Sequence, residues 1–344
     1  MRRIQSAAER RRKSKTMPRT PQPLPYDGIL VVNKPRGKTS HDVVDAVRRI
    51  VGFRQIGHLG TLDPLATGVL VLLLGKATRL AQFYIGRRKR YTATIRFGYS
   101  TDTYDSVGTA IGPDAAPVLI RTEIEKMAAA MTGRFAQMPP PYSAKKIQGK
   151  AAYELARKNK PVELKPVEIE VYEFHVTETD GSRAKVAIEC ASGTYIRSIA
   201  HDMGQTLGCG AHLEEITRTA VGEFTLDQAV TVEALHEASQ QSAEKLSSYV
   251  LPLELLLPEL PRINVLPIIE RQIRHGSKFN IVPSQIKPGS IAMAQGATTE
   301  LDSGEWTPNR LRIFSPENKL IAIAEAIVPR TYRPILVLAS EPNS

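Results

Sequence analysis

Hydrophobic positions recur with strand and helix periods along most of the chain after residue 25. The stretch 28–40, GILVVNKPRGKTS, begins as a short apolar strand and breaks at Pro35 and Gly37. Thr39 or Ser40 then caps a helix, HDVVDAVRRIVG, because apolar residues recur at 43, 44, 47, 50 and 51. After a glycine-rich loop, the apolar run 69–74 predicts a strand or another buried segment.

The middle of the chain combines strand-like and helix-like patterns. Strict alternation in 87–100 predicts a strand with one apolar face, formed by Tyr91, Ala93, Ile95, Phe97 and Tyr99. The pattern predicts a helix over 120–133 that ends at Gly133, and another over 194–208. Between them, a proline-stiffened loop passes into a short basic helix over 138–160, and two strands follow at 167–178 and 182–193.

Prolines cluster in LPLELLLPELPRI (251–263), which marks a boundary. Beyond it, short β-like runs such as LRIFS and KLIAIAEAI are typical of a small β-barrel. The sequence therefore predicts a tail and proline-rich lead-in at 1–25, a main domain at 26–257 and a smaller domain at 258–344.

Charge adds a preference for a polyanionic partner. The chain has 344 residues and a formal net charge of +11, which favours RNA or DNA over a membrane. Residues 1–16 carry seven Lys or Arg and one Glu, hence +6, and the rest carries 11 − 6 = +5. That tail is read as a solvated segment, an RNA-binding arm or a transit peptide. No run of eighteen apolar residues predicts a transmembrane helix.

Two motifs argue against metal and nucleotide chemistry. The two cysteines, Cys190 and Cys209, lack the spacing of metal ligands. A chain of this length with only two cysteines is typical of a reducing compartment. The run GVLVLLLGKAT resembles a phosphate-binding loop, but six residues separate Gly68 from Gly75, and Ala77 stands where Ser or Thr would bind magnesium. We expect no metal and no cofactor.

The loop GHLGTLDPLATG (57–68) places Asp63 and His58 on a segment that is costly to order, because glycine loses the most backbone freedom on folding. An isolated Asp-Pro is an ordinary turn, and an isolated histidine is usually structural. The neighbouring sequence motifs instead favour a functional role for both residues. GILVVNKPRGKTSHDVV, GHLGTLDPLATGVLVLLLGKATR, KRYTATIRFG, STDTYDSVG, MPPPYSAKKIQGKAAYELAR and CASGTYIRSIAHDMG resemble, in order, blocks of the TruB family, the synthases that make pseudouridine at position 55 of tRNA.

This resemblance covers about residues 28–222 and implies a fold and a reaction. The fold is α+β, with a central mixed, mostly antiparallel sheet flanked by helices and a small PUA-like C-terminal barrel. The reaction cuts a uridine base from its ribose and rejoins it through carbon, without a cofactor. A carboxylate suits this chemistry as nucleophile or as stabiliser of charge on the sugar. The base must first be flipped out of the RNA.

The resemblance also assigns residues. Asp63 is the catalytic aspartate, and the glycines let the backbone approach the flipped nucleotide. The matching substrate-binding positions are Tyr91, which stacks on the base, Tyr195, Arg197, which pairs with the aspartate, His58, which enters the T-loop, and Lys34, which supports the loop. The family usually has Leu-Arg-Arg where AHLEEITRTAVG gives Glu215-Ile216-Thr217-Arg218. Ile216 keeps the apolar pocket wall, whereas one charge that faces RNA is lost.

An insertion at about 138–165 is expected to close over the RNA. Its cations, Lys145, Lys146, Lys150 and Arg157 among them, would bind phosphates, and the alternative is a solvated helix face. The partner is then the T-arm of tRNA, and we expect a cytoplasmic monomer that needs no protein partner. Two other functions remain open: a guide-RNA-dependent synthase of the same superfamily, and an RNA-binding protein without catalysis.

Overall fold

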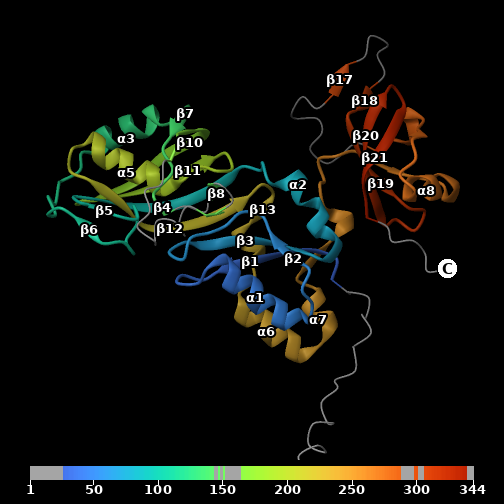
Figure 1. Ribbon diagram of the computed structural model, residues 1–344, viewed down its shortest axis with the longest axis horizontal. Coiled ribbons are helices and arrows are strands. Elements are labelled where there is room, and N and C mark those ends of the chain that lie inside the picture. The colour runs from blue at the N-terminus through green and yellow to red at the C-terminus, as the bar shows by residue number, and fades with distance from the viewer. Residues whose placement is uncertain are drawn as a thin grey trace, which may run out of the picture.

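A long mixed sheet forms the centre of the molecule (Figure 1). The computed structural model describes residues 26–142, 146–147, 150–151, 164–287, 298–300 and 306–338. In spatial order the strands are β14 (Val250–Pro252), β1 (Gly28–Lys34), β3 (Thr67–Leu74), β12 (Ala211–Val221), β4 (Lys89–Phe97), β11 (Arg183–Cys190), β10 (Val167–Asp180) and β7 (Gly133–Gln137). Two short strands extend it: β2 (Ile56–His58) pairs with β3, and β13 (Phe224–Thr225) pairs with β12.

The sheet is antiparallel except where β12 pairs with β3 in parallel, at Thr217 with Thr67 and Arg218 with Gly68. The predicted mixed, mostly antiparallel sheet is therefore confirmed. Strand β3 is central and apolar on both faces: Leu70, Leu72 and Leu74 join one hydrophobic core, and Val69, Val71 and Leu73 join another. A continuous apolar run rather than an alternating one is what a strand buried on both sides requires.

Four helices of ten or more residues contribute to the same core as Leu70 and Leu72, as does Leu246 of a shorter helix, so they cover one face of the sheet. The four longer helices are α1 (Ser40–Val51), α3 (Arg121–Ala130), α5 (Ile196–Thr206) and α6 (Val232–Gln241). Figure 1 shows α1 and α6 near β1 and β3, and α3 and α5 toward β10 and β11. Thr39 and Asp42 form a capping box at the start of α1, and Gly52 ends it in the left-handed conformation.

Smaller elements complete this part of the chain. The helices are α2 (Ala81–Tyr84) and α7 (Ala243–Ser247), with 3₁₀ helices η2 (Gly75–Leu80), η3 (Leu226–Gln228) and η4 (Leu253–Leu255). The strand pairs are β5 (Ser100–Thr101) with β6 (Ala110–Ile111), and β8 (Lys146–Ile147) with β9 (Lys150–Ala151). No helix in the described part of the chain is long and apolar enough to cross a membrane.

A second, five-stranded sheet lies to the right in Figure 1. Its order is β15 (Arg262–Asn264), β19 (Arg310–Phe314), β20 (Leu320–Val328), β21 (Thr331–Val337) and β16 (Phe279–Asn280), with α8 (Pro267–Arg274), η5 (Pro283–Gln285) and the pair β17 (Thr298–Glu300) and β18 (Trp306–Pro308). The main sheet's β14 ends at Pro252 and β15 begins at Arg262, so the predicted division after 257 falls between the two sheets.

The structure differs from the sequence-based expectations in three places. The helix expected over 120–133 ends at Ala130, and Gly133 instead starts β7 with a φ of 99°. Tyr99, expected on the strand face with Tyr91, lies beyond the end of β4. The basic segment expected to be loop and helix contains the β8–β9 hairpin, and residues 152–163 lie outside the described part of the chain.

Candidate active site

The loop that carries Asp63 connects β2 to β3, and glycine begins and ends it in a conformation that other residues rarely adopt. Gly60 has a φ of 92° and Gly68 a φ of 95°. A Cβ atom on Gly68 would lie 2.3 Å from the carbonyl oxygen of Arg218, so only glycine lets β12 approach β3 here. Gly68 therefore allows the close strand contact that anchors the loop.

Buried polar side chains hold the backbone of this loop from behind. The Ser40 hydroxyl accepts a hydrogen bond from the Leu62 amide at 2.8 Å and donates to the Leu62 carbonyl at 3.2 Å. The Lys34 ammonium donates to the Ala66 carbonyl at 2.6 Å and to the Pro35 carbonyl at 2.9 Å. Because buried carbonyls need donors, these contacts fix the loop in one conformation.

Arg218 holds both ends of the loop. Its Nε donates to the Val69 carbonyl at 2.8 Å, and Nη2 donates to the Gly60 carbonyl at 3.0 Å. A third, longer contact joins Nη1 to the Thr61 carbonyl at 3.4 Å. Asp63 lies between these anchored ends.

Asp63 forms an ion pair with Arg197, whose Nε lies 2.9 Å from Oδ2. Arg197 is held in turn by backbone, because Nη1 donates to the Thr103 carbonyl at 2.9 Å and Nη2 to the Tyr142 carbonyl at 3.0 Å. Asp105 lies on its far side, with Oδ2 at 3.7 Å from Nη1. Arg197 therefore lies between two carboxylates, of which Asp105 is buried and Asp63 is open to solvent.

The Asp63 carboxylate opens into a cavity of about 270 Å³. Five residues predicted for the site line it together: Asp63, Tyr91, Tyr195, Arg197 and Ile216. The rest of the wall includes Leu65, Lys89, Asp105, Thr194, Ile196, Leu213 and Arg218. The Tyr195 backbone is held by Gln137, which accepts from its amide at 2.8 Å and donates to its carbonyl at 3.0 Å.

Lys34 and His58 do not line this cavity. Lys34 is fully buried behind the loop. This burial lowers the pKa of its ammonium group to about 8, although the negative charge of Asp63 acts to raise it. His58 ends β2 and is half-buried; burial, with the Arg218 charge, lowers the pKa of its imidazole. Both therefore belong to the surroundings of the loop in this structure.

The predicted phosphate-binding cations all belong to the basic segment 145–157. Lys145 and Arg157 lie outside the described residues. Lys146 and Lys150 start the two strands of the β8–β9 hairpin, but their side chains are outside the described part. Their contact with RNA stays a prediction.

Three further residues line the cavity, although no sequence motif indicated them: Lys89, Asp105 and Arg218. Lys89 lies two residues before Tyr91 on β4, so strand alternation places it on the same inward face. Burial lowers the pKa of Lys89 to about 8 and raises that of Tyr91 to about 12. The Tyr91 hydroxyl is therefore protonated across the neutral range.

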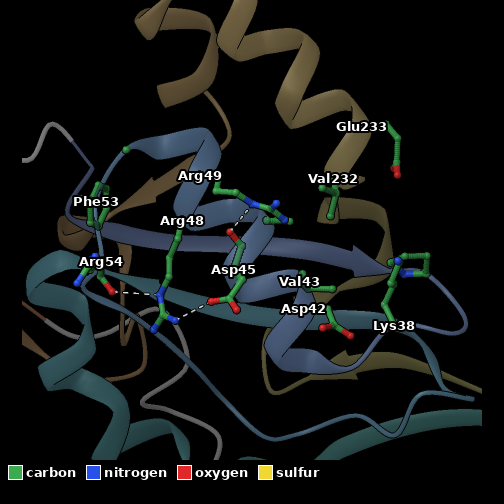
Figure 2. Close-up of a pocket in the computed structure, with 13 residues that line it drawn as sticks. Lys38, Asp42, Val43, Asp45, Arg48, Arg49, Phe53, Arg54, Val232 and Glu233 are labelled. Carbon is green, nitrogen blue, oxygen red and sulfur yellow. Dashed lines mark hydrogen bonds and ion pairs between the residues drawn. The ribbon is translucent and has the colours of Figure 1, made fainter. Parts of the chain in front are cut away.

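A larger groove of about 770 Å³ follows α1 (Figure 2). Its charged side chains pair with their own neighbours: Arg48 donates to Asp45 at 2.9 Å and to the Arg54 carbonyl at 3.2 Å. None of Asp63, Tyr91 or Arg197 lines it. Among the described residues no group of three His, Cys, Asp or Glu side chains could hold a metal ion.

Comparison with known proteins connects this cavity to a family. The N-terminal domain model of the TruB family of pseudouridylate synthases matches residues 48–196. The model of the tRNA pseudouridylate synthase B C-terminal domain matches residues 197–258. Together the two matches include Asp63, Tyr91, Arg197 and Arg218.

Relatives match over most of their length. The chain is 43% identical to tRNA pseudouridine synthase B of Solibacter usitatus over 91% of this chain and 100% of that protein. It is 37% identical to tRNA pseudouridine synthase B of Aquifex aeolicus over 83% of this chain and 100% of that protein.

Solved structures share the fold. A crystal structure of a Cbf5-Nop10-Gar1 complex matches with a TM-score of 0.63 and 25% identity, over 89% of this chain and 80% of that one. An H/ACA RNP bound to a substrate RNA containing 2'-deoxyuridine matches with a TM-score of 0.65 and 22% identity, over 91% and 86%. On the sequence matches and the fold together, the chain belongs to the TruB family of pseudouridylate synthases.

Proposed function

We propose that this protein isomerises uridine 55 in the T-arm of tRNA to pseudouridine, with Asp63 as the catalytic carboxylate. Membership of the TruB family supports the reaction and the tRNA substrate. The observation that carries the assignment of Asp63 is its ion pair with the buried Arg197 at the edge of a cavity that is open to solvent.

The geometry suits a carboxylate that acts in its ionised form. The Arg197 guanidinium favours the charged state of Asp63 and sets the direction of its oxygens. The open side of the carboxylate faces the cavity, where the ribose of a flipped nucleotide would lie next to it. There Asp63 attacks the sugar, attacks the base or stabilises positive charge on the sugar while the glycosidic bond is broken.

The cavity walls suit a planar base. Tyr91 offers an aromatic face, and Ile216 and Leu213 offer apolar surface against which a detached ring can turn. Stacking on an aromatic side chain contributes about 1–3 kcal/mol per base. It therefore offsets part of the cost of removing the base from the RNA stack. Tyr91, Tyr195 and Ile216 are therefore proposed to hold the base, and His58 to fill its place in the T-loop.

The remaining assignments extend this proposal beyond the cavity. We assign catalysis to residues 26–257 and further RNA binding to the PUA-like part at 258–344. Lys145, Lys146, Lys150 and Arg157 bind backbone phosphates, which gives affinity and register rather than base choice. The protein acts in the cytoplasm, as a monomer, on tRNA alone.

The alternative, a guide-RNA-dependent synthase, takes its support from the shared fold of the H/ACA and Cbf5 complexes. The decisive experiment uses purified protein, an unmodified tRNA transcript and a T-arm hairpin, and maps pseudouridine in each. We expect modification at position 55 in both RNAs without any added protein or guide. A protein that binds the transcript but leaves every uridine unchanged would contradict the proposed function.

A further inference from the structure

Among the residues that the structure describes, Arg218 is the largest side chain that is almost completely buried, with 1% of the residue exposed. Within the described part of the chain, no carboxylate lies at ion-pair distance from its guanidinium, in contrast to Arg197. Burying a charge without a counter-ion is costly, so its other contacts must compensate. Arg218 is compensated by backbone carbonyl groups instead.

The three carbonyls that Arg218 binds come from the two ends of one loop. Gly60 and Thr61 precede Asp63, at 3.0 and 3.4 Å, and Val69 follows it, at 2.8 Å. A guanidinium presents its N–H donors in a rigid planar fork, so one side chain can fix two segments relative to each other. A lysine ammonium has no such fork.

The same residue lies beside the aromatic wall of the cavity. Arg218 on β12 lies opposite Tyr91 on β4 in the strand register, and both side chains line the cavity. On its other side the Arg218 backbone lies opposite Gly68 on β3. Arg218 therefore binds the loop that carries Asp63 and is the cross-strand neighbour of the tyrosine proposed to stack on the base.

We infer that Arg218 is a positioning residue, which fixes the place of the Asp63 carboxylate relative to Tyr91 by joining both ends of the Asp63 loop. The inference rests on the proposed function, because it concerns the geometry of that reaction. Ser40 and Lys34 hold the middle and the end of the loop, so the backbone keeps two anchors when Arg218 is changed. The carboxylate then shifts while the fold is retained.

The test uses Arg218→Lys in the full-length protein, which removes the planar set of guanidinium donors but keeps the positive charge. Turnover of a T-arm hairpin is measured as separate kcat and KM values, and hairpin affinity is measured by filter binding. The matched control is Arg312→Lys. Arg312 is also buried and also donates to carbonyls, those of Leu260 at 3.0 Å and Leu256 at 3.1 Å, but it lies in the second sheet.

For Arg218→Lys we expect kcat to fall roughly 100-fold, the effect of a misplacement of about 1 Å, while KM and hairpin affinity stay within about threefold. Arg312→Lys should leave kcat within about threefold, since its carbonyls are remote from Asp63. Thermal unfolding and circular dichroism establish that each variant is folded, and Arg218→Gln serves if the lysine variant is not.

Several results would overturn the inference. A folded Arg218 variant with wild-type kcat would do so, as would a loss confined to KM and affinity, which assigns Arg218 to RNA binding. If neither Arg218 variant folds, the residue acts in folding rather than in positioning. An inactive wild-type protein would instead contradict the proposed function, so the two failures are distinguishable.

Discussion

The Arg197 side chain is 6% exposed, yet its Nε lies 2.9 Å from Oδ2 of an Asp63 side chain that is 45% exposed. The guanidinium is held inside the protein by the carbonyls of Thr103 and Tyr142. The carboxylate is therefore oriented from the protein side and remains free on the cavity side. Such preorganisation suits a group that must act without moving.

Asp63→Asn removes the charge and keeps the shape. We expect pseudouridine formation to fall by more than about 1,000-fold, because the amide is neither a nucleophile nor an effective stabiliser of positive charge. RNA affinity should change by less than about threefold, since phosphate contacts supply most of it. The measurements are single-turnover rate and hairpin binding. A parallel loss of both would assign Asp63 to docking or folding.

Asp105→Asn tests whether Arg197 depends on its second carboxylate. Asp105 accepts hydrogen bonds from the Thr103 hydroxyl at 2.6 Å and the Val107 amide at 3.1 Å, with Arg197 at 3.7 Å. The amide weakens this support, so we expect kcat to fall by roughly 10- to 100-fold with RNA binding retained.

The control for Asp105→Asn is Asp114→Asn. Asp114 also pairs with an arginine, Arg96 at 2.6 Å, but lies outside the cavity wall. The Asp114→Asn variant should turn over the hairpin at the same rate as the wild type. Equal losses in the two variants would show that general destabilisation, and not the orientation of Arg197, lowers the rate.

Tyr91→Phe separates the ring from the hydroxyl. The ring should still stack on the base, so hairpin affinity is expected to be unchanged, whereas kcat should fall by roughly 10- to 100-fold if the hydroxyl transfers a proton. Tyr91→Leu should also lose about 1–3 kcal/mol of stacking. Tyr84→Phe is the control, because its hydroxyl is also buried, where it accepts from the Leu257 amide at 2.9 Å. Wild-type turnover in Tyr91→Phe would leave the ring alone as the functional group.

Periodicity was sufficient for most individual elements. The helix after Thr39, the strand around Tyr91 and the helix after Tyr195 occur where apolar spacing predicts them. Each depends on local sequence, because one face must be apolar for an element to pack on a core. The second sheet also appears where short β-like runs predict it, at β19 and β20.

The arrangement of the cavity could not be read from such patterns. Asp63 and Arg197 are 134 positions apart, and their contact depends on β12 lying between β3 and β4. Resemblance to a family, not periodicity, paired them. Arg218 escaped assignment because arginines on strands usually face solvent, and only the β3–β12 pairing shows that this one is enclosed by carbonyls.

Lys89 provides a test through stability. It is 6% exposed, it lines the cavity beside the Arg218 charge, and burial lowers its pKa from 10.5 to about 8. Below pH 8 the lysine is charged in both folded and unfolded protein, so folding carries the full cost of burying the ammonium. Between pH 8 and 10.5 the folded protein releases the proton first, the unfolded chain binds more protons, and stability rises with pH.

Lys89→Met removes this cost, so the variant should be more stable than the wild type at pH 7, by roughly 1–3 kcal/mol. The advantage should shrink as pH rises from 8 to 10.5, because the wild-type lysine is then increasingly neutral in the folded state. Urea unfolding of both proteins at pH 7, 9 and 10.5 measures the difference, in which the other titrating groups cancel. Lys126→Met on the exposed face of α3 is the control and should show no such trend. A Lys89→Met protein that is less stable than the wild type by the same amount at every pH would mean that the Lys89 charge is fully compensated in the folded protein.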